Sequence, residues 1–122
     1  MPAADETRHK EADMAEDTEG TPVLDTLAVM TAASIEQCEL APRELMLARI
    51  AALAAVDAPP VSYLLNAGTA SDVGVTLEDV QGVLVAVAPV VGTARVMSAA
   101  GNITRALGFA IAVVEAELED LE

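Results

Sequence analysis

The chain has 122 residues and a formal net charge of −14; 53% of the residues are hydrophobic, but only 2% are aromatic. This charge argues against nucleic acid as a partner, because binding phosphates requires Lys and Arg side chains, and it also disfavours anionic membrane surfaces. A single small domain with a core of Ala, Val, Leu, Ile and Met buries little area. We therefore expect a homo-oligomer.

Residues 1–20 are rich in Glu and Asp, show no apolar periodicity, and are predicted to form a disordered acidic tail. His9, the only histidine, lies there and is interpreted as a solvated side chain. The polar start is unlike a secretory signal. The longest uncharged run, between Asp79 and Arg95, is shorter than the roughly 20 residues that a membrane span needs. We expect a cytoplasmic protein outside the membrane.

A first helix is predicted to begin near Thr21, with Pro22 at its first position. Its apolar residues recur at helical spacing and are expected to face the core: Leu24, Leu27, Ala28, Thr31 and Ile35. Cys38 lies at or just beyond the end of this helix. As the only cysteine, it forms no internal disulfide, and it is interpreted as a small core residue rather than a nucleophile.

A second helix is predicted to start after Ala41-Pro42 and to run to about Val56. From Leu45 onward only Arg49 is charged, and a helix that is apolar on nearly every side is buried on nearly every side. In a domain this small, that pattern predicts that a neighbouring subunit covers one face. The run Asp57-Ala-Pro-Pro ends the helix, because proline cannot continue the hydrogen-bond ladder.

The third helix is predicted from about Pro60 to Val73, and Ser62, Tyr63 and Asn66 share one face of it. Gly74 has the position of a left-handed C-terminal residue. Thr76 and Asp79 then form a variant of the capping box that opens a fourth helix. The fourth helix carries the apolar stripe Val80, Val83, Leu84 and Val87, and Pro89 is expected to end or kink it.

A fifth helix is predicted from about Gly92-Thr93 to Leu118. One face is apolar (Val96, Ala100, Ile103, Leu107, Ile111, Val114, Leu118), and a stripe of small residues, including Gly101 and Gly108, is expected to permit close contact with another helix. The acidic residues 115–122 lie at the unfavourable end of the helix dipole, so this end is expected to fray. No strand pattern of useful length is present. The predicted fold class is all-α.

Three segments together resemble the carboxymuconolactone decarboxylase family, which includes the alkyl hydroperoxidase D-like proteins: Pro42-Arg-Glu-Leu-Met-Leu-Ala-Arg-Ile-Ala-Ala-Leu, Gly74-Val-Thr-Leu-Glu-Asp-Val and Ala88-Pro-Val-Val-Gly-Thr-Ala-Arg-Val. The resemblance covers roughly Leu24 to Leu107. It implies an antiparallel bundle of about five helices, assembled as trimers or hexamers. The family-like domain would occupy residues 21–114, between the tail 1–20 and the fraying end 115–122.

The resemblance does not extend to the residues that carry the family's chemistry. The two cysteines of redox members fall on Pro59 and Ser62, and the histidine falls on Asn66. Neither proline nor serine delivers a thiolate, and asparagine does not shuttle protons near neutral pH. Glu44 is the nearest candidate for the glutamate that often completes the relay. The active site is therefore interpreted as degenerate with respect to both the redox and the decarboxylase branches.

Three functions remain open from the sequence. In the first, a non-redox pocket binds or transforms a small organic acid or lactone, with Ser62, Tyr63 and Asn66 as the catalytic or orienting groups. Glu44, Arg49 and Arg95 would then bind the ligand, the arginines by holding a carboxylate.

In the second, the protein is a catalytically degenerate oligomeric scaffold, and these polar groups satisfy one another or the backbone between subunits. The third, a peroxidase acting through Cys38, is disfavoured, because the only histidine lies in the tail. We expect no cofactor and no metal in any of the three.

Overall fold

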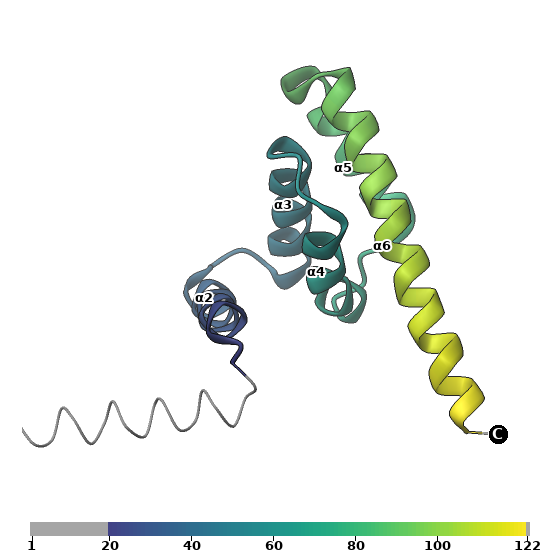
Figure 1. Ribbon diagram of the computed structural model, residues 1–122. Helices are drawn as coiled ribbons and strands as arrows, with labels where there is room; N and C mark the ends of the chain where they lie inside the picture. The colour runs from purple at the N-terminus through teal and green to yellow at the C-terminus, as the bar shows by residue number, and fades with distance from the viewer. Residues whose placement is uncertain (1–19, 122) are drawn as a thin grey trace, which may run out of the picture. The chain divides into compact units, whose positions relative to one another are not determined.

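The computed structural model describes residues 20–121, which form five helices and no strand, so the all-α prediction is confirmed for this part of the chain. The predictions for the acidic tail and for His9 fall on residues 1–19, outside the described residues. The helices are α2 (Pro22–Gln37), α3 (Pro42–Ala55), α4 (Pro60–Asp72), α5 (Leu77–Val91) and α6 (Thr93–Asp120) (Figure 1).

The helices begin where local sequence signals predict. Pro22, Pro42 and Pro60 occupy the first positions of α2, α3 and α4, where a missing N–H costs nothing because that group has no partner inside the helix. At the start of α5, the Asp79 amide donates to Thr76 Oγ1 at 3.1 Å, and the Thr76 amide donates to the Asp79 carboxylate at 2.9 Å. The predicted capping box is confirmed.

Two glycines make the turns between α4, α5 and α6. Gly74 has a φ of +83° and Gly92 a φ of +89°, a region that a residue with a Cβ enters only under strain. The predicted left-handed conformation of Gly74 is confirmed. Pro89 lies inside α5, which continues to Val91, so this proline does not end the helix.

The chain divides into two units, residues 1–39 and residues 40–122. This division was not predicted, since the sequence pattern indicated one domain over residues 21–114. No residue of α2 is buried. The stripe expected to face the core (Leu24, Leu27, Ala28, Thr31 and Ile35) therefore has no core to pack on within its own unit, because α2 is the only described helix there.

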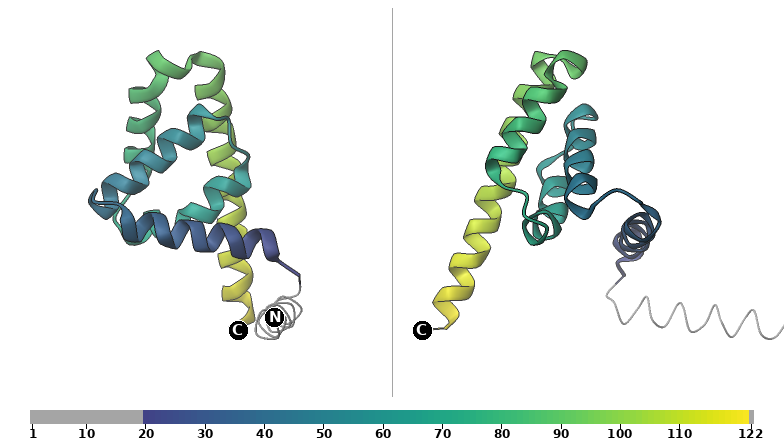
Figure 2. Two further views of the ribbon diagram at one scale, coloured as in Figure 1. Left: turned by 90° about the vertical axis from the view of Figure 1, so that its left-hand side faces the viewer. Right: turned by 180° about the vertical axis from the view of Figure 1, so that it is seen from behind.

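In the second unit, α3 contacts α4, α5 and α6, while α6 contacts α4 and α5 (Figure 2). The sequence predicted that α3 is buried on nearly every side, but within this chain Arg43, Glu44, Ala48 and Ala52 are exposed. Its buried residues are Leu45, Met46, Ile50 and Ala54. The unit itself covers these residues. What remains exposed toward the end of α3 is mostly small, with Ala48 and Ala52 as examples.

The centre of this unit is a small apolar cluster. Its buried members are Ala58, Tyr63, Ile103 and Ala106, and the half-buried side chains of Leu53, Leu64, Val80 and Leu84 pack against them. The predicted inward stripe of α5 is half-buried along its length. Many of the buried residues are alanines. The core therefore contains few large side chains, and they do not fill all the space between the helices.

Two side chains of α6 hold the connection between α3 and α4 in place by hydrogen bonds. Arg95 Nη1 donates to the Ala55 carbonyl at 2.6 Å, and Asn102 Nδ2 donates to the Ala58 carbonyl at 3.1 Å. These bonds fix the start of α4, which carries the candidate site residues.

The second half of α6 extends beyond the other helices of its unit (Figures 1 and 2). Ile103 is buried, but the rest of its predicted stripe from Leu107 onward is exposed. The helix continues to Asp120 without a break at Val114. Within this chain, a Cβ at Gly101 or Gly108 would meet no atom within 4 Å, so the close helix contact predicted for the small-residue stripe is not made here.

By length and composition alone, α6 is apolar enough to cross a membrane, and 11% of its most apolar stretch is buried. The length of uncharged runs in the sequence did not identify α6 as a candidate span, because Arg105 interrupts its apolar stretch. The core helix of a soluble protein passes the same test, and Ala99, Ile103 and Ala106 of α6 are buried among the other helices.

Candidate functional site

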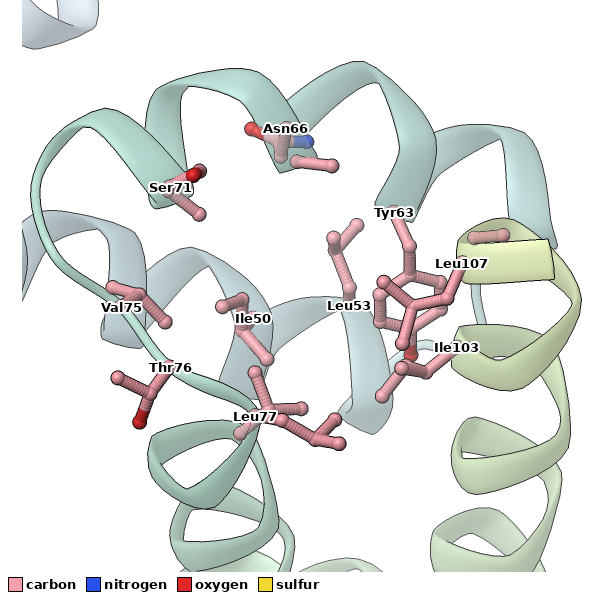
Figure 3. Close-up of a pocket in the computed structure, with 14 residues that line it drawn as sticks. Ile50, Leu53, Tyr63, Asn66, Ser71, Val75, Thr76, Leu77, Ile103 and Leu107 are labelled. Atoms are coloured by element: carbon pink, nitrogen blue, oxygen red, sulfur yellow. The ribbon is translucent and has the colours of Figure 1, made fainter. Parts of the chain in front are cut away.

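A cavity of about 260 Å³ lies between α3, α4, α6 and the start of α5 (Figure 3). Its wall is almost entirely apolar, and the polar side chains in it are those of Tyr63, Asn66, Ser71 and Thr76. None of the residues that line the cavity is charged. The lining residues are Ile50, Leu53, Tyr63, Asn66, Ala67, Ala70, Ser71, Val75, Thr76, Leu77, Val80, Ile103, Ala106 and Leu107.

One face of α4 supplies the polar part of the wall. Tyr63, Asn66, Ala67, Ala70 and Ser71 follow the spacing i, i+3, i+4, i+7 and i+8, which places them on one side of a helix. The sequence prediction grouped Tyr63 and Asn66 on this side correctly. It missed Ala67 and Ser71, although the same spacing identifies them.

Tyr63 is the most distinctive residue of the cavity. It is 7% exposed, and its ring extends from α4 toward Ile103 of α6 (Figure 3). Its hydroxyl is buried and has no hydrogen-bond partner in the described structure. Burial raises the pKa of the Tyr63 phenol above its ordinary value, and the negative charge of Asp57 raises it further. The hydroxyl is therefore neutral at physiological pH and available as a donor.

Asn66 is half-buried, and its Nδ2 donates to the carbonyl oxygen of Ser62, one turn earlier in α4, at 2.8 Å. The Thr76 hydroxyl accepts the Asp79 amide in the capping box. The Asn66 amide and the Thr76 hydroxyl are thus already hydrogen-bonded to nearby backbone groups. The Tyr63 hydroxyl differs from these groups because it is buried without a partner.

The structure separates the predicted site residues. Tyr63 and Asn66 line the cavity together, but Ser62 does not. The predicted ligand-binding residues Glu44, Arg49 and Arg95 do not line it either. Glu44 is exposed in the first turn of α3, Arg49 is half-buried in the same helix, and the Arg95 guanidinium is engaged by the Ala55 carbonyl. A carboxylate in the cavity would meet no positive charge.

The positions that correspond to the family's cysteines and histidine lie at the start and middle of α4, where Pro59 is the N-cap residue. Cys38 is a free, half-buried thiol at the C-cap of α2, in the other unit. Among the described residues, no three His, Cys, Asp or Glu side chains lie close enough together to hold a metal ion. The cavity therefore offers hydrogen bonding and apolar contact as its chemistry.

Taken together, these features define an all-α helical protein with an apolar, uncharged cavity, lined in part by Tyr63, whose hydroxyl is buried without a partner. No protein family, no curated protein and no solved structure matched this chain. The resemblance to the carboxymuconolactone decarboxylase family therefore stays a prediction based on the sequence segments given above.

Proposed function

We propose that this protein is a divergent, non-redox relative of the carboxymuconolactone decarboxylase family that binds a small, neutral, largely apolar molecule in the cavity between α3, α4, α5 and α6. A lactone is the class of ligand that fits best. The proposal depends on one observation above all, the buried Tyr63 hydroxyl without a partner.

A buried hydroxyl without a partner is unusual, because most buried polar side-chain atoms in proteins form at least one hydrogen bond. Leaving such a group unpaired costs about 1–3 kcal/mol. The hydroxyl oxygen is closed off from solvent in this structure, so a ligand carbonyl accepts its proton only when the Tyr63 ring turns toward the cavity. That hydrogen bond would remove the cost, while the hydrocarbon part of the ligand contacts Ile50, Leu53 and Ile103. The observation thus supports a ligand with one acceptor on an apolar body.

The size and charge of the cavity narrow the ligand class. Drug-sized ligands occupy pockets of roughly 300–1,000 Å³, so a cavity of about 260 Å³ suits a smaller molecule. An ionised acid is disfavoured, because burying a carboxylate without a charged or donor-rich partner is very costly. Of the two classes that the sequence left open, the neutral lactone is therefore favoured over the organic acid.

The cavity supports binding better than turnover. The Tyr63 hydroxyl can polarise a bound carbonyl by donating a hydrogen bond, which is a modest form of electrostatic stabilisation. No residue in the wall is a thiol, an imidazole or a carboxylate, so the wall supplies neither a strong nucleophile nor a general base near neutral pH.

The test compares a lactone with the acid formed by opening its ring. We expect ε-caprolactone to bind the protein in isothermal titration calorimetry and to raise its melting temperature, whereas 6-hydroxyhexanoate, which has the same carbon chain but carries a charge, does not. Tyr63→Phe removes only the hydroxyl and should weaken lactone binding by about three- to tenfold. Equal binding of lactone and acid, or an unchanged affinity in Tyr63→Phe, would contradict the proposal.

A second function, an oligomeric scaffold, is favoured by a different observation. Many large apolar side chains of the second unit are exposed, among them Val61, Leu65, Leu77, Val85 and Val90. Exposed large apolar side chains, where they gather into one patch, are typical of interaction sites. Self-association as a trimer or hexamer, which the family resemblance implies, would cover part of it. A protein that forms oligomers but binds no small neutral ligand would support this alternative.

A further inference from the structure

We propose that the ligand of the cavity is a lactone that carries an unbranched alkyl tail of about four or five carbons. The lactone carbonyl accepts the hydrogen bond from Tyr63, and the tail runs along α4 toward the connection between α4 and α5. The proposal rests on the lactone site described above, and it specifies which lactones bind that site best.

The cavity is elongated along α4. Its wall on this helix extends from Tyr63 to Ser71, and these positions are roughly 12 Å apart at the 1.5 Å rise per residue of an α-helix. Ile103 of α6 lies beside Tyr63 at one end, and Val75 and Thr76 lie beside Ser71 at the other (Figure 3). A lactone ring with its carbonyl spans about half of this length, so a ring alone leaves the other half empty.

The volume of the cavity also exceeds that of a simple lactone. At the packing density of about 0.75 that is found in protein interiors, a cavity of about 260 Å³ holds ~190 Å³ of ligand atoms. The atoms of ε-caprolactone fill only about 110 Å³, as the packing density of organic liquids implies. An extended alkyl chain advances roughly 1.3 Å per carbon, so about four or five carbons fill the remaining length.

The half of the cavity farther from Tyr63 is suited to a hydrocarbon chain. Its wall includes Ala70, Val75 and Leu77, and the Thr76 hydroxyl there is already bonded within the capping box. Leu77 is 57% exposed at the first position of α5. A chain that contacts Leu77 therefore removes apolar surface of both the ligand and the protein from water.

Exposure indicates the direction of the ligand. Near α6, Tyr63 is 7% and Ile103 is 9% exposed, with Leu107 at the rim at 41%. At the other end, Ser71 and Thr76 are both exposed. A tail that starts from a ring beside Tyr63 thus points toward the opening at the α4–α5 connection. Carbons beyond that opening enter water and add little to the affinity.

The experiment measures how affinity depends on tail length. The lactones δ-valerolactone, δ-octalactone, δ-decalactone and δ-dodecalactone share one ring and differ in an alkyl tail of zero, three, five or seven carbons. In isothermal titration calorimetry of the full chain, we expect affinity to rise about three- to fourfold per carbon as far as δ-decalactone, because each buried methylene contributes. δ-Dodecalactone should then bind at most about twofold more tightly than δ-decalactone.

The outcomes separate the tail from the site. An affinity that does not change with tail length would overturn the tail, while binding of ε-caprolactone that depends on Tyr63 would leave the site itself supported. An affinity that keeps rising by the same factor to δ-dodecalactone would indicate adsorption on exposed apolar surface, and it would overturn the tail as well. If none of these lactones bound, the site and the tail would both be refuted.

Two leucine variants test where the tail lies. Leu77→Ala shortens a side chain of the far half of the cavity, and Leu65→Ala is the matched control, because Leu65 is 62% exposed on α4 and does not line the cavity. We expect Leu77→Ala to weaken δ-decalactone at least threefold more than δ-valerolactone, and Leu65→Ala to weaken neither.

Tyr63→Phe acts on the carbonyl, so it should weaken the two lactones by the same factor. Equal effects of Leu77→Ala on both lactones would overturn the assigned orientation.

Discussion

Ser98 of α6 donates a hydrogen bond from its Oγ to the carboxylate of Asp57 at 2.6 Å, across 41 residues of sequence. Asp57 is the only described non-glycine residue with a positive φ, at +55°, a conformation that is costly for side chains other than Asn, Asp and Gly. The bond therefore helps to hold the left-handed turn at Asp57 between α3 and α4. That turn sets where α4, and with it Tyr63, begins.

Removing this bond should destabilise the fold modestly. We expect Ser98→Ala to lower the free energy of unfolding by about 1 kcal/mol, the usual contribution of one hydrogen bond near the surface. Urea denaturation measures the change. A double-mutant cycle with Asp57→Gly, which removes the acceptor and tolerates the positive φ, isolates the pair, and a coupling near zero would show that the contact contributes no stability.

Lowering the pH should destabilise the first turn of α5, because it protonates the Asp79 carboxylate of the capping box. The Thr76 amide, followed by the Arg43 guanidinium at 2.6 Å, lowers the pKa of this carboxyl below its ordinary value of 3.8. The pKa of Asp79 is lower in the folded protein than in the unfolded chain. Its stabilising contribution is therefore fully present above the unfolded-state pKa, and it is lost as the pH falls through the folded-state pKa. Asp79→Asn should reduce the slope of stability against pH in this acidic range. Denaturant titrations of both proteins at several pH values below 5 provide the measurement, and parallel curves would refute the assignment.

Tyr63→Phe should separate stability from ligand binding. Because the substitution removes a buried hydroxyl without a partner and keeps the ring, we expect the variant to be at least as stable as the wild type, with a gain on the order of 1 kcal/mol. Thermal and urea unfolding without ligand test this. A clear loss of stability would mean that the hydroxyl has a structural partner, and the basis for the proposed ligand site would disappear.

Tyr63 should also make the stability of the folded protein depend on pH in the basic range. The raised pKa of the Tyr63 phenol means that the folded protein resists ionisation of this group more than the unfolded chain does. Its contribution is therefore present below the unfolded value of 10.0 and is lost as the pH rises through the folded pKa. Tyr63→Phe should be less sensitive to base than the wild type. Denaturant titrations between neutral pH and pH 11 decide the point, and equal sensitivity would contradict it.

Filling the cavity should abolish ligand binding without unfolding the protein. Ala67 lines the cavity from α4, and Ala67→Met places a flexible apolar side chain into it. We expect lactone binding to fall below detection while the free energy of unfolding changes by less than about 1.5 kcal/mol. Gly68→Ala is the control, because a Cβ there meets no atom within 4 Å. It should leave binding unchanged and stabilise the helix by about 0.5–1 kcal/mol.

Local sequence signals were enough to predict the helices and where they start. The signals responsible act within about four residues: a proline in the first turn of α2, α3 and α4, the Thr76–Asp79 capping box, and the positive φ of Gly74. The 3.6-residue period likewise placed Tyr63 and Asn66 on one face of α4. Such signals need no knowledge of the rest of the chain.

Which residues contact one another depends instead on how distant helices pack. Arg95 was expected to bind a ligand, but it is engaged by the Ala55 carbonyl 40 residues away. The periodicity of α2 did not reveal that its own unit offers this helix no core, and that of α6 did not reveal that its second half is exposed. A helical stripe shows that one side prefers burial, but the covering surface depends on how distant helices pack. The cavity beside Tyr63 has the same origin, because a gap between four elements belongs to none of them alone.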